Sequence, residues 1–427
     1  MTSLLKKDYP SIKETLHYGQ LANGLRVYLI KKEGYSEKTA MLTARFGSLD
    51  TSFTVNCQSI DLPSGVAHFL EHKLFEDKDG NDIALTFTQL GSETNAFTTF
   101  DQTSYFFSTV NEWQESLRLL QEFVAAPSFT EESVNREKHI ITQEIEMYQD
   151  DPDYQAYSGI LQNLFPNTSL AIDIAGTKES IRDITGSLLA DSHAYFYHPS
   201  NMVLTIIGDI DIEAAFTAIE VFQDSQPSQP QHDVQVAPLI YHPVIKSRSI
   251  DMDIATAKLA VGFRGQLMSS GYSLLTYQVA LKLLLAMLLG WTSKAYQDWY
   301  EKGKIDDSFD IEVDIQRDFQ FVLISSDTSQ PIAMSNSIRK KIADFRCSRD
   351  INEEHLQLVK KEMYGDFMQS LDAIDQLASQ FNLHLSEQET YFDIPRIIET
   401  LTLKDITEIG SLFFEHAAAS DFTVFPK

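Results

Sequence analysis

The chain has 427 residues, which is long for one hydrophobic core and predicts two or more domains. Hydrophobic residues make up 43% and charged residues 22%, so disorder, collagen and coiled coil are excluded as descriptions of the whole chain. The formal net charge is −27, and nucleic acid and anionic membrane surfaces would repel so acidic a protein. This charge favours solubility, and it also suits cationic substrates.

Strand and helix patterns follow one another irregularly in the first half of the chain. Alternating β-branched and aromatic residues predict strands over residues 24–30, 38–46 and 104–110. Apolar residues at helical spacing predict helices over residues 64–75, 111–125, 130–148 and 180–197. Because the regular strand–helix–strand order of a parallel sheet is missing, we expect an α+β fold, with helices on one face of an antiparallel-rich sheet.

A stretch rich in Gln, Pro and Ser separates two halves of the chain, because the hydrophobic periodicity stops there. It predicts a linker over residues 223–243, between a first domain of residues 1–222 and a second domain of residues 244–427.

The two halves match each other at a constant offset of 222 in the numbering. Residues 131–138 share a Glu-Glu pair and a Lys with residues 353–360, and residues 182–185 resemble residues 404–407. Two matches at one offset predict an internal duplication, and therefore two homologous domains.

Cysteine usage and the N-terminus bear on the compartment. Cys57 and Cys347 form no CxxC or zinc-binding spacing, which suits a reducing environment. The N-terminal residues lack the continuous apolar segment of a signal peptide, and the longest apolar run, residues 279–291, is interrupted by Lys282. We expect a cytoplasmic protein that does not span a membrane.

The sharpest chemical pattern is HxxEH, which places His68, Glu71 and His72 in a predicted helix. Helix positions i and i+4 lie one turn apart on the same face, so the two histidines can bind one metal ion with the glutamate beside them. The alternative is a histidine pair satisfied at the surface or in the core. Two imidazoles on a largely buried helix need a partner, which favours the metal site.

A catalytic zinc ion takes three protein ligands and keeps one position open for water. No other histidines cluster near the motif, so the third ligand should be a carboxylate. Glu137 and Glu144 are seven residues apart and share a helix face, whereas Glu146 points elsewhere. One of the pair can bind the metal while the other orients a ligating histidine. Taken alone, such a pair is typical of a solvated helix face.

HxxEH followed about seventy residues later by this glutamate pair resembles the inverted zinc peptidases of the pitrilysin/insulinase family. Residues 91–98 (GSETNAFT) resemble the substrate-pairing edge strand of that family. Residues 197–202 (YHPSNM) resemble its loop before the last strand of the first domain. The resemblance covers nearly the whole chain and is nearest to the bacterial, processing-peptidase-like members.

The resemblance implies one zinc ion per chain, bound by His68, His72 and Glu144. It implies that Glu71 is the general base for a metal-activated water and that Glu137 supports the site. The fold it implies is two homologous α+β domains that close on a chamber, in agreement with the duplication.

The same resemblance implies how a peptide substrate binds. The substrate would add a strand along Asn95, Ala96, Phe97 and Thr98, where backbone hydrogen bonds hold it and side-chain selection is loose.

The second half departs from the family pattern. Applying the same offset to HxxEH gives residues 290–294 (GWTSK), which cannot bind zinc, so we expect an inactive copy. Family members carry an Arg/Tyr pair after this region, whereas the alignment places Tyr300 and Asp307 there. An aspartate would repel a developing oxyanion. Either the alignment is shifted by a few residues or a paralogous subunit supplies the Arg/Tyr pair, and we favour the paralogue.

The sequence therefore predicts a zinc-dependent metalloendopeptidase that hydrolyses peptides or short unfolded segments, as the zinc-bearing subunit of a heterodimer. The alternative is a non-catalytic structural or peptide-binding subunit, in which the metal motif would be degraded. Because His68, Glu71, His72 and Glu144 are all present, the enzyme is favoured.

Overall fold

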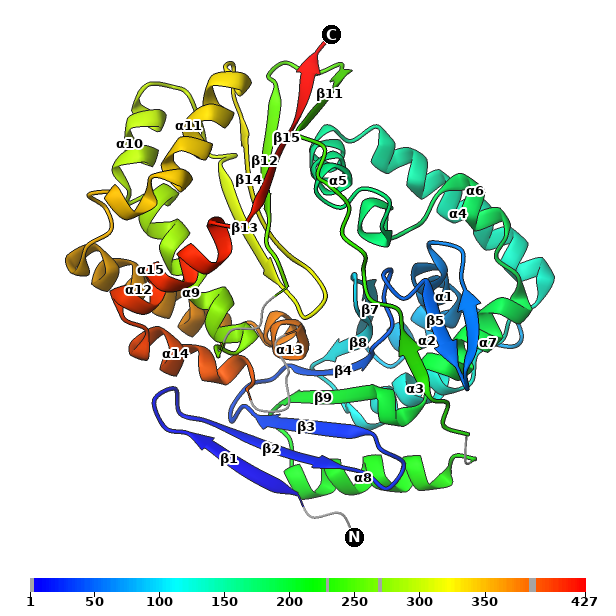
Figure 1. The fold of residues 1–427 in the computed structure, drawn as a ribbon. Helices are drawn as coiled ribbons and strands as arrows, with labels where there is room; N and C mark the ends of the chain where they lie inside the picture. Colours follow the sequence, from blue (N-terminus) through cyan, green and yellow to red (C-terminus); the bar gives the residue numbers. More distant parts are fainter. Residues whose placement is uncertain (1–3, 228–229, 268–270, 384–388) are drawn as a thin grey trace. The chain divides into compact units, whose positions relative to one another are not determined.

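The computed structural model describes residues 4–227, 230–267, 271–383 and 389–427 (Figure 1). The chain forms two compact units. Unit 1 comprises Met1–Ile145, Asp173–Ala237 and Ser370–Ser386, and unit 2 comprises Glu146–Ile172, Pro238–Gln369 and Glu387–Lys427.

Unit 1 is built on a seven-stranded sheet of order β1-β2-β3-β9-β4-β8-β7 and a three-stranded sheet of order β10-β5-β6. Its strands are β1 (Leu5–Tyr9), β2 (Glu14–Gln20), β3 (Arg26–Lys31), β4 (Lys38–Ala44), β5 (Ser52–Val55), β6 (Gln58–Asp61), β7 (Ser92–Thr98), β8 (Thr103–Thr109), β9 (Met202–Gly208) and β10 (Val234–Val236). Its helices are α1 (Val66–Leu74), α2 (Ile83–Gln89), α3 (Gln114–Ala125), most of α4 (Glu131–Gln149), α6 (Lys178–Arg182), α7 (Gly186–Phe196), η2 (Pro199–Asn201), α8 (Ile212–Ser225) and α13 (Ile374–Leu383).

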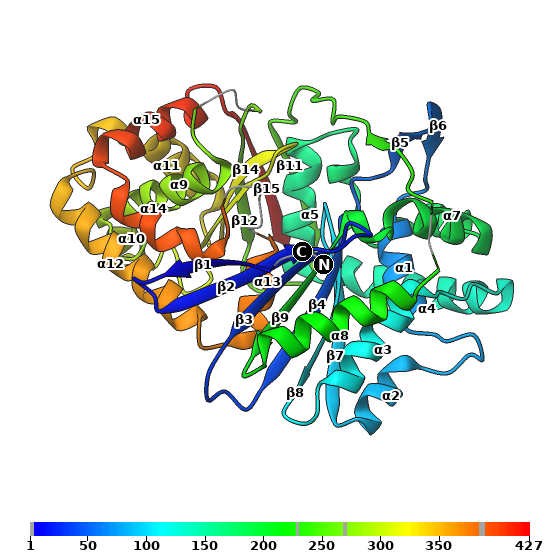
Figure 2. The same cartoon turned by 90° about the horizontal axis from the view of Figure 1, so that it is seen from below.

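The core of unit 1 lies on one face of the large sheet. Alternate strand residues such as Leu29, Leu42 and Leu204 point to this face, where side chains of α1, α3, α4, α7 and α8 pack on them. Figure 2 shows α8 running across the β3 side of the sheet. Helix α13 covers the opposite face, where Asn382 donates to Thr43 Oγ1 at 2.8 Å and accepts from Thr205 Oγ1 at 2.6 Å.

Unit 2 is built on a five-stranded sheet of order β11-β15-β12-β14-β13. Its strands are β11 (Ser247–Met252), β12 (Lys258–Arg264), β13 (Asp310–Ile315), β14 (Gln320–Asp327) and β15 (Ala418–Pro426). Its helices are α5 (Pro152–Leu164), η1 (Ser169–Ala171), α9 (Leu274–Leu289), α10 (Lys294–Glu301), α11 (Pro331–Ala343), η3 (Phe345–Cys347), α12 (Glu353–Ser370, to Gln369 in this unit), η4 (Tyr391–Asp393), α14 (Ile394–Thr400) and α15 (Leu403–Phe414).

Helices cover both faces of the unit 2 sheet (Figure 1). The apolar helix α9 and helices α11 and α15 pack on one face and form the core with Leu259 and Val261 of β12. Helix α5 packs on β12 and β15 from the other face. It approaches closely because Gly159 faces the ring of Phe422 and Gly262 faces α5; a Cβ at Gly159 would lie 2.4 Å from that ring.

The duplication predicted from the sequence is confirmed by the topology. The order β3-β9-β4-β8-β7 in unit 1 repeats as β11-β15-β12-β14-β13 in unit 2. In both sheets the first pair is parallel and the other three pairs are antiparallel. The α+β fold class, with two homologous domains, is therefore confirmed. The expectation that helices lie on one face of the sheet is wrong, because α13 in unit 1 and α5 in unit 2 cover the second face.

One of the two sequence matches joins residues that are not equivalent. Glu131 and Glu353 both begin long helices, α4 and α12, as the offset of 222 predicts. Thr185 caps α7, whereas residues 404–407 lie inside α15, which is capped by Thr402. The equivalent caps, Thr185 and Thr402, are therefore fewer than 222 residues apart. The reason is that the segments before these caps differ in length between the two halves. The same cap at Thr185 divides the helix predicted over residues 180–197 into α6 and α7.

The compact units differ from the contiguous domains 1–222 and 244–427. The cut between Ala237 and Pro238 falls within the predicted linker 223–243, of which residues 228 and 229 lie outside the described residues. In addition, α5 of the first half belongs to unit 2 and α13 of the second half belongs to unit 1. The two exchanged helices begin at Pro152 and Ile374, which the offset of 222 relates, so they are counterparts in the duplication.

No single helix among the described residues is long and apolar enough to cross a membrane. Helices α9 and α10 reach the required length and composition only as a pair bent by 45°. Helix α9 is the central core helix of unit 2, which accounts for its apolar composition.

Candidate metal centre

Helix α1 carries three of the predicted site residues, His68, Glu71 and His72. It begins after Gly65, whose φ of 92° lies in the left-handed region. A Cβ at this position would lie 2.5 Å from the carbonyl oxygen of Ala175, so this turn requires glycine. The apolar side of the helix is buried in the core of unit 1, and the two imidazole rings lie one turn apart with centroids 4.5 Å from each other.

Helix α4 supplies the carboxylates. Glu137 and Glu144 lie two turns apart on one face, and buried Val134, Ile141 and Ile145 fasten the helix to the core. The structure therefore brings both predicted glutamates to the histidines of α1.

An ion-pair cluster that was not predicted from the sequence joins the same two helices. Glu76, just after α1, accepts from the fully buried Lys73 Nζ at 2.7 Å and from Arg136 Nη2 of α4 at 3.0 Å. Burial raises the pKa of Glu76, but the hydrogen bonds and charges of Lys73 and Arg136 outweigh it and lower this pKa. A lysine inside an apolar helix was the sequence sign of this cluster.

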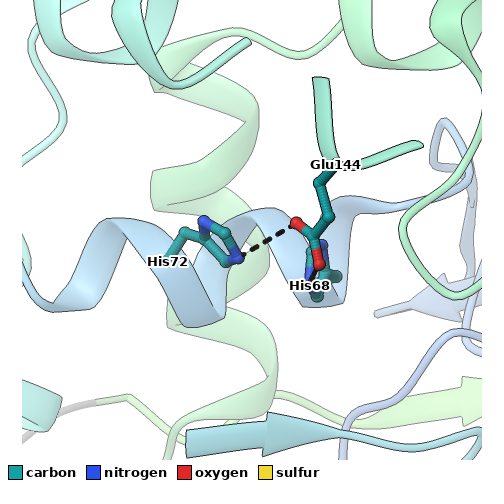
Figure 3. A group of neighbouring side chains, drawn as sticks. All are labelled: His68, His72 and Glu144. Carbon is teal, nitrogen blue, oxygen red and sulfur yellow. Dashed lines mark ion pairs between the residues drawn. The ribbon is translucent and has the colours of Figure 1, made fainter. Parts of the chain in front are cut away.

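His68, His72 and Glu144 converge on one point (Figure 3). His68 Nε2 lies 3.7 Å from Glu144 Oε1, and His72 Nε2 lies 3.6 Å from Glu144 Oε2. These distances are long for hydrogen bonds. Two atoms each about 2.1 Å from a tetrahedral zinc ion lie about 3.4 Å apart, so the observed spacings suit shared coordination. The donor set and its spacing fit zinc.

The second nitrogen of each imidazole has a different environment. His72 Nδ1 lies 2.9 Å from Glu137 Oε1, which fixes the tautomer that leaves Nε2 free for a metal ion. His68 Nδ1 is buried and has no hydrogen-bond partner among the described residues. The ring of His68 is held by burial instead, with 9% of the residue exposed.

The environment sets the charge of the two histidines. Burial, with a smaller contribution from neighbouring His72, lowers the pKa of His68 to about 3 and keeps it neutral, as a ligand must be. Burial also lowers the pKa of His72, but Glu137, Glu71 and Glu144 outweigh it and the net pKa is raised.

Glu71 lies beside the metal ligands and outside the group that converges on one point. Burial raises the pKa of its carboxyl group, and the Thr98 hydroxyl, which donates to Oε2, opposes this rise. A carboxylate with a raised pKa next to a metal centre is suited to accepting a proton.

The predicted substrate-pairing residues lie on β7, the last strand of the large sheet. On its outer side β7 has no neighbouring strand among the described residues. Asn95 Oδ1 accepts from the Ala96 N–H at 2.9 Å, and the ring of Phe97 lies 6.3 Å from that of Phe106. The Thr98 side chain is directed to Glu71, a contact that was not predicted from the sequence.

Unit 2 has no counterpart of the metal-binding group among its described residues. Residues 290–294 follow the end of α9, so the expectation that they are the counterpart of α1 is wrong. The helix in the corresponding place is α9 itself, and it contains no His, Cys, Asp or Glu. Tyr300 is the penultimate residue of α10, and its hydroxyl donates to Asp307 Oδ1 at 3.4 Å on the surface of the unit.

An HxxEH helix completed by a glutamate from a second helix defines a metallopeptidase centre of the inverted HxxEH type. The chain matches the model for insulinase (peptidase family M16) over residues 60–178 and the model for the peptidase M16 inactive domain over residues 183–363. The chain belongs to the M16 peptidase family and is a zinc metallopeptidase.

Two relatives from Bacillus subtilis (strain 168) have been named as zinc proteases. The chain is 35% identical to the uncharacterized zinc protease YmfH over 98% of its own length and 97% of that protein. It is 24% identical to the uncharacterized zinc protease YmxG over 82% of the chain and 86% of that protein.

Solved structures are similar along nearly the whole chain. A putative M16-like peptidase from Alicyclobacillus acidocaldarius is 30% identical, with a TM-score of 0.90 over 97% of this chain and 99% of that one. A protease from Helicobacter pylori is 19% identical, with a TM-score of 0.80 over 96% and 99% of the two chains, and shows the same fold.

Proposed function

We propose that this chain is an endopeptidase for peptides or short unfolded segments, with His68, His72 and Glu144 as zinc ligands and Glu71 as general base. The observation that carries the proposal is the convergence of the three donors while the Glu71 carboxylate, on the same helix, stays outside the ligand group. Three protein ligands leave a position for water at a catalytic zinc ion, and a separate carboxylate can act on that water.

Each residue has a definable task in this mechanism. A zinc ion bound by these ligands would supply a Lewis acid that lowers the pKa of water and polarises a peptide carbonyl. Glu71 would take the proton of the attacking water and deliver it to the leaving amine. Glu137 would hold His72 in the tautomer that presents Nε2.

The substrate would bind along the outer side of β7, next to Asn95, Ala96, Phe97 and Thr98. An edge strand offers unpaired N–H and C=O groups to an extended peptide. Because the Ala96 N–H already donates to Asn95 Oδ1, the asparagine side chain would move as the peptide pairs.

We also propose that a paralogous subunit supplies an Arg/Tyr pair and forms a heterodimer with this chain. The alignment of the sequence with the family pattern places Tyr300 and Asp307 at these positions, and neither carries a positive charge. The two side chains are engaged with each other, and an aspartate would repel a developing oxyanion.

The substitution Glu71→Gln tests the general base. It should retain stoichiometric zinc and lower the hydrolysis of an unstructured peptide by about 10²- to 10⁴-fold, because the proton acceptor is lost. Glu146→Gln removes an exposed carboxylate from α4 and serves as the matched control, with activity near that of the wild type. Substantial activity of Glu71→Gln would rule out this role.

Reconstitution tests the heterodimer. The purified, zinc-loaded chain should be weakly active alone and gain activity when mixed with a paralogue that lacks HxxEH and carries the Arg/Tyr pair. Full activity of the chain by itself would exclude the partner.

We further propose a cytoplasmic location, because both cysteines, Cys57 and Cys347, are free and exposed, as suits a reducing environment. Fractionation of the source cells tests this location. Recovery of the protein outside the cytoplasmic fraction would contradict it.

A further inference from the structure

The Glu71 carboxylate depends on one neighbouring hydroxyl group. Thr98, at the end of β7, donates from Oγ1 to Glu71 Oε2, and this is the only hydrogen bond to that carboxylate among the described residues. Thr98 was predicted as a substrate-pairing residue, and its side chain contacts the helix that carries Glu71.

The strand geometry directs the side chain and the backbone groups of Thr98 to different places. Side chains of a strand alternate between the faces of the sheet, whereas the backbone groups lie in the plane of the sheet and form its edge. Thr94, Ala96 and Thr98 share the face that holds the core and α1. A change of the Thr98 side chain therefore acts on Glu71 and leaves the backbone edge for a substrate strand in place.

The groups around Thr98 leave its proton to Glu71. Its cross-strand partner Thr103 lies 3.4 Å away, Oγ1 to Oγ1, and Thr103 donates to the carbonyl oxygen of Phe46 at 2.8 Å. Glu71 Oε2 is therefore the favoured acceptor for the proton of the Thr98 hydroxyl.

Other hydroxyl groups near Glu71 are occupied. Tyr105 and Tyr197 both lie close enough to sense the charge of Glu71, but their hydroxyl groups pair with each other at 2.8 Å and both side chains are buried. This pair uses one of the two hydroxyl protons, and among the described residues neither tyrosine donates to Glu71.

We propose that Thr98 is a positioning residue: its side-chain hydroxyl holds the Glu71 carboxylate in the orientation that accepts the proton of the attacking water. The inference rests on the proposed function of Glu71. A long glutamate side chain without this bond would have several rotamers within reach of the site, drawn toward His72 in some and kept from Glu144 in others.

Three variants test the proposal. Thr98→Val removes the hydroxyl while keeping a β-branched side chain, and Thr98→Ser restores the hydroxyl. Thr94→Val is the matched control, because Thr94 lies on the same face of β7 and its hydroxyl donates to the carbonyl oxygen of Phe106 at 2.8 Å rather than to Glu71.

The first readout is independent of turnover. In crystal structures of the zinc-loaded proteins, Glu71 should leave its wild-type rotamer or become disordered in Thr98→Val, and should keep that rotamer in Thr98→Ser and Thr94→Val. Zinc content should be unchanged in all three. An unmoved Glu71 in Thr98→Val would overturn the proposal.

The second readout separates positioning from substrate binding. With an unstructured fluorogenic peptide, Thr98→Val should lower kcat by about tenfold to a hundredfold, as for a lost hydrogen bond to a charged group, with KM unchanged. Thr98→Ser should recover most of kcat, and Thr94→Val should stay within about twofold of the wild type. A raised KM at unchanged kcat would assign Thr98 to the substrate and overturn positioning.

The substitution Glu71→Gln distinguishes a failure of the proposed general base from a failure of the positioning role of Thr98. If it stays active, the general base is lost from the proposed function, and the crystal structures still decide whether Thr98 orients Glu71. If it is inactive and Thr98→Val behaves as the wild type in both readouts, only the positioning role falls.

Discussion

Units 1 and 2 share a strand order and differ in the helix that follows the second equivalent strand. Helix α1 has nine residues and carries His68, Glu71 and His72, whereas α9 has sixteen residues and Lys282 as its single charged side chain. Both helices bury side chains in the core of their unit. The shared strand order is therefore built in unit 2 without a metal centre, and the chemistry depends on a few side chains placed on the fold.

The long helices α4 and α12 show the same contrast. At the offset of 222, Glu137 corresponds to Val359, which is buried, and Glu144 corresponds to Asp366, which is exposed. The position that orients a histidine in unit 1 therefore fills the core in unit 2. Polar groups on a buried helix face are retained where they have partners, and unit 2 has lost those partners.

The largest expected effect concerns the metal ligands, which lie on α1 of unit 1 and are absent from α9 of unit 2. His68→Ala should lose stoichiometric zinc, with affinity lowered by more than about a hundredfold, since removal of a ligand exceeds the loss of an orienting partner. Leu285→Ala on α9 should cost about 2–5 kcal/mol of stability and leave the zinc content unchanged, because it removes only buried apolar contacts. Elemental analysis and thermal unfolding measure the two effects. Full zinc content in His68→Ala would contradict the ligand assignment.

A smaller effect concerns the exchanged helices. Gly159→Ala on α5 should lower stability by about 1–3 kcal/mol, because its Cβ would meet the Phe422 ring at 2.4 Å. Gly365→Ala on α12 is the control: nothing lies within 4 Å of its Cβ, so it should stabilise the helix by about 0.5–1 kcal/mol. Chemical denaturation of both variants gives the comparison. Equal shifts in the same direction would show that α5 does not depend on this close packing.

The last effect is a pH dependence confined to unit 2. Burial, with nearby Asp314 and Asp310, raises the pKa of Glu312 on edge strand β13 from 4.5 to about 7. Between these values the folded protein holds a proton that the unfolded chain has released, so stability falls as pH rises from about 4.5 to 7. Glu312→Gln should remove this part of the decline, as followed by melting temperature across the range. An unchanged pH profile would refute the shifted pKa.

The local elements of unit 1 were well predicted from the sequence. The strands expected over residues 24–30, 38–46 and 104–110 are β3, β4 and β8, and the helices over residues 64–75 and 130–148 are α1 and α4. Helix α5 was not predicted from the sequence, and an acidic turn precedes it. In the fold, Asp151 of that turn caps α5. An acidic turn can end one helix or cap the next, so its composition alone does not predict a helix after it. The apolar spacing of the residues that follow was the better indication of α5.

The sequence by itself determined the pair His68 and His72 with Glu71, because residues one helical turn apart share a face wherever the helix lies. It also indicated the duplication, since homologous halves keep similar spacing. It left open which of Glu137 and Glu144 faces the histidines, and the resemblance alone supplied that choice. Only the tertiary structure placed Glu144 beside both histidines, Glu137 behind His72 and Thr98 on Glu71, and only it exchanged α5 and α13 between the units. These contacts join segments far apart in the chain, where position depends on packing of the whole core and no local periodicity records it.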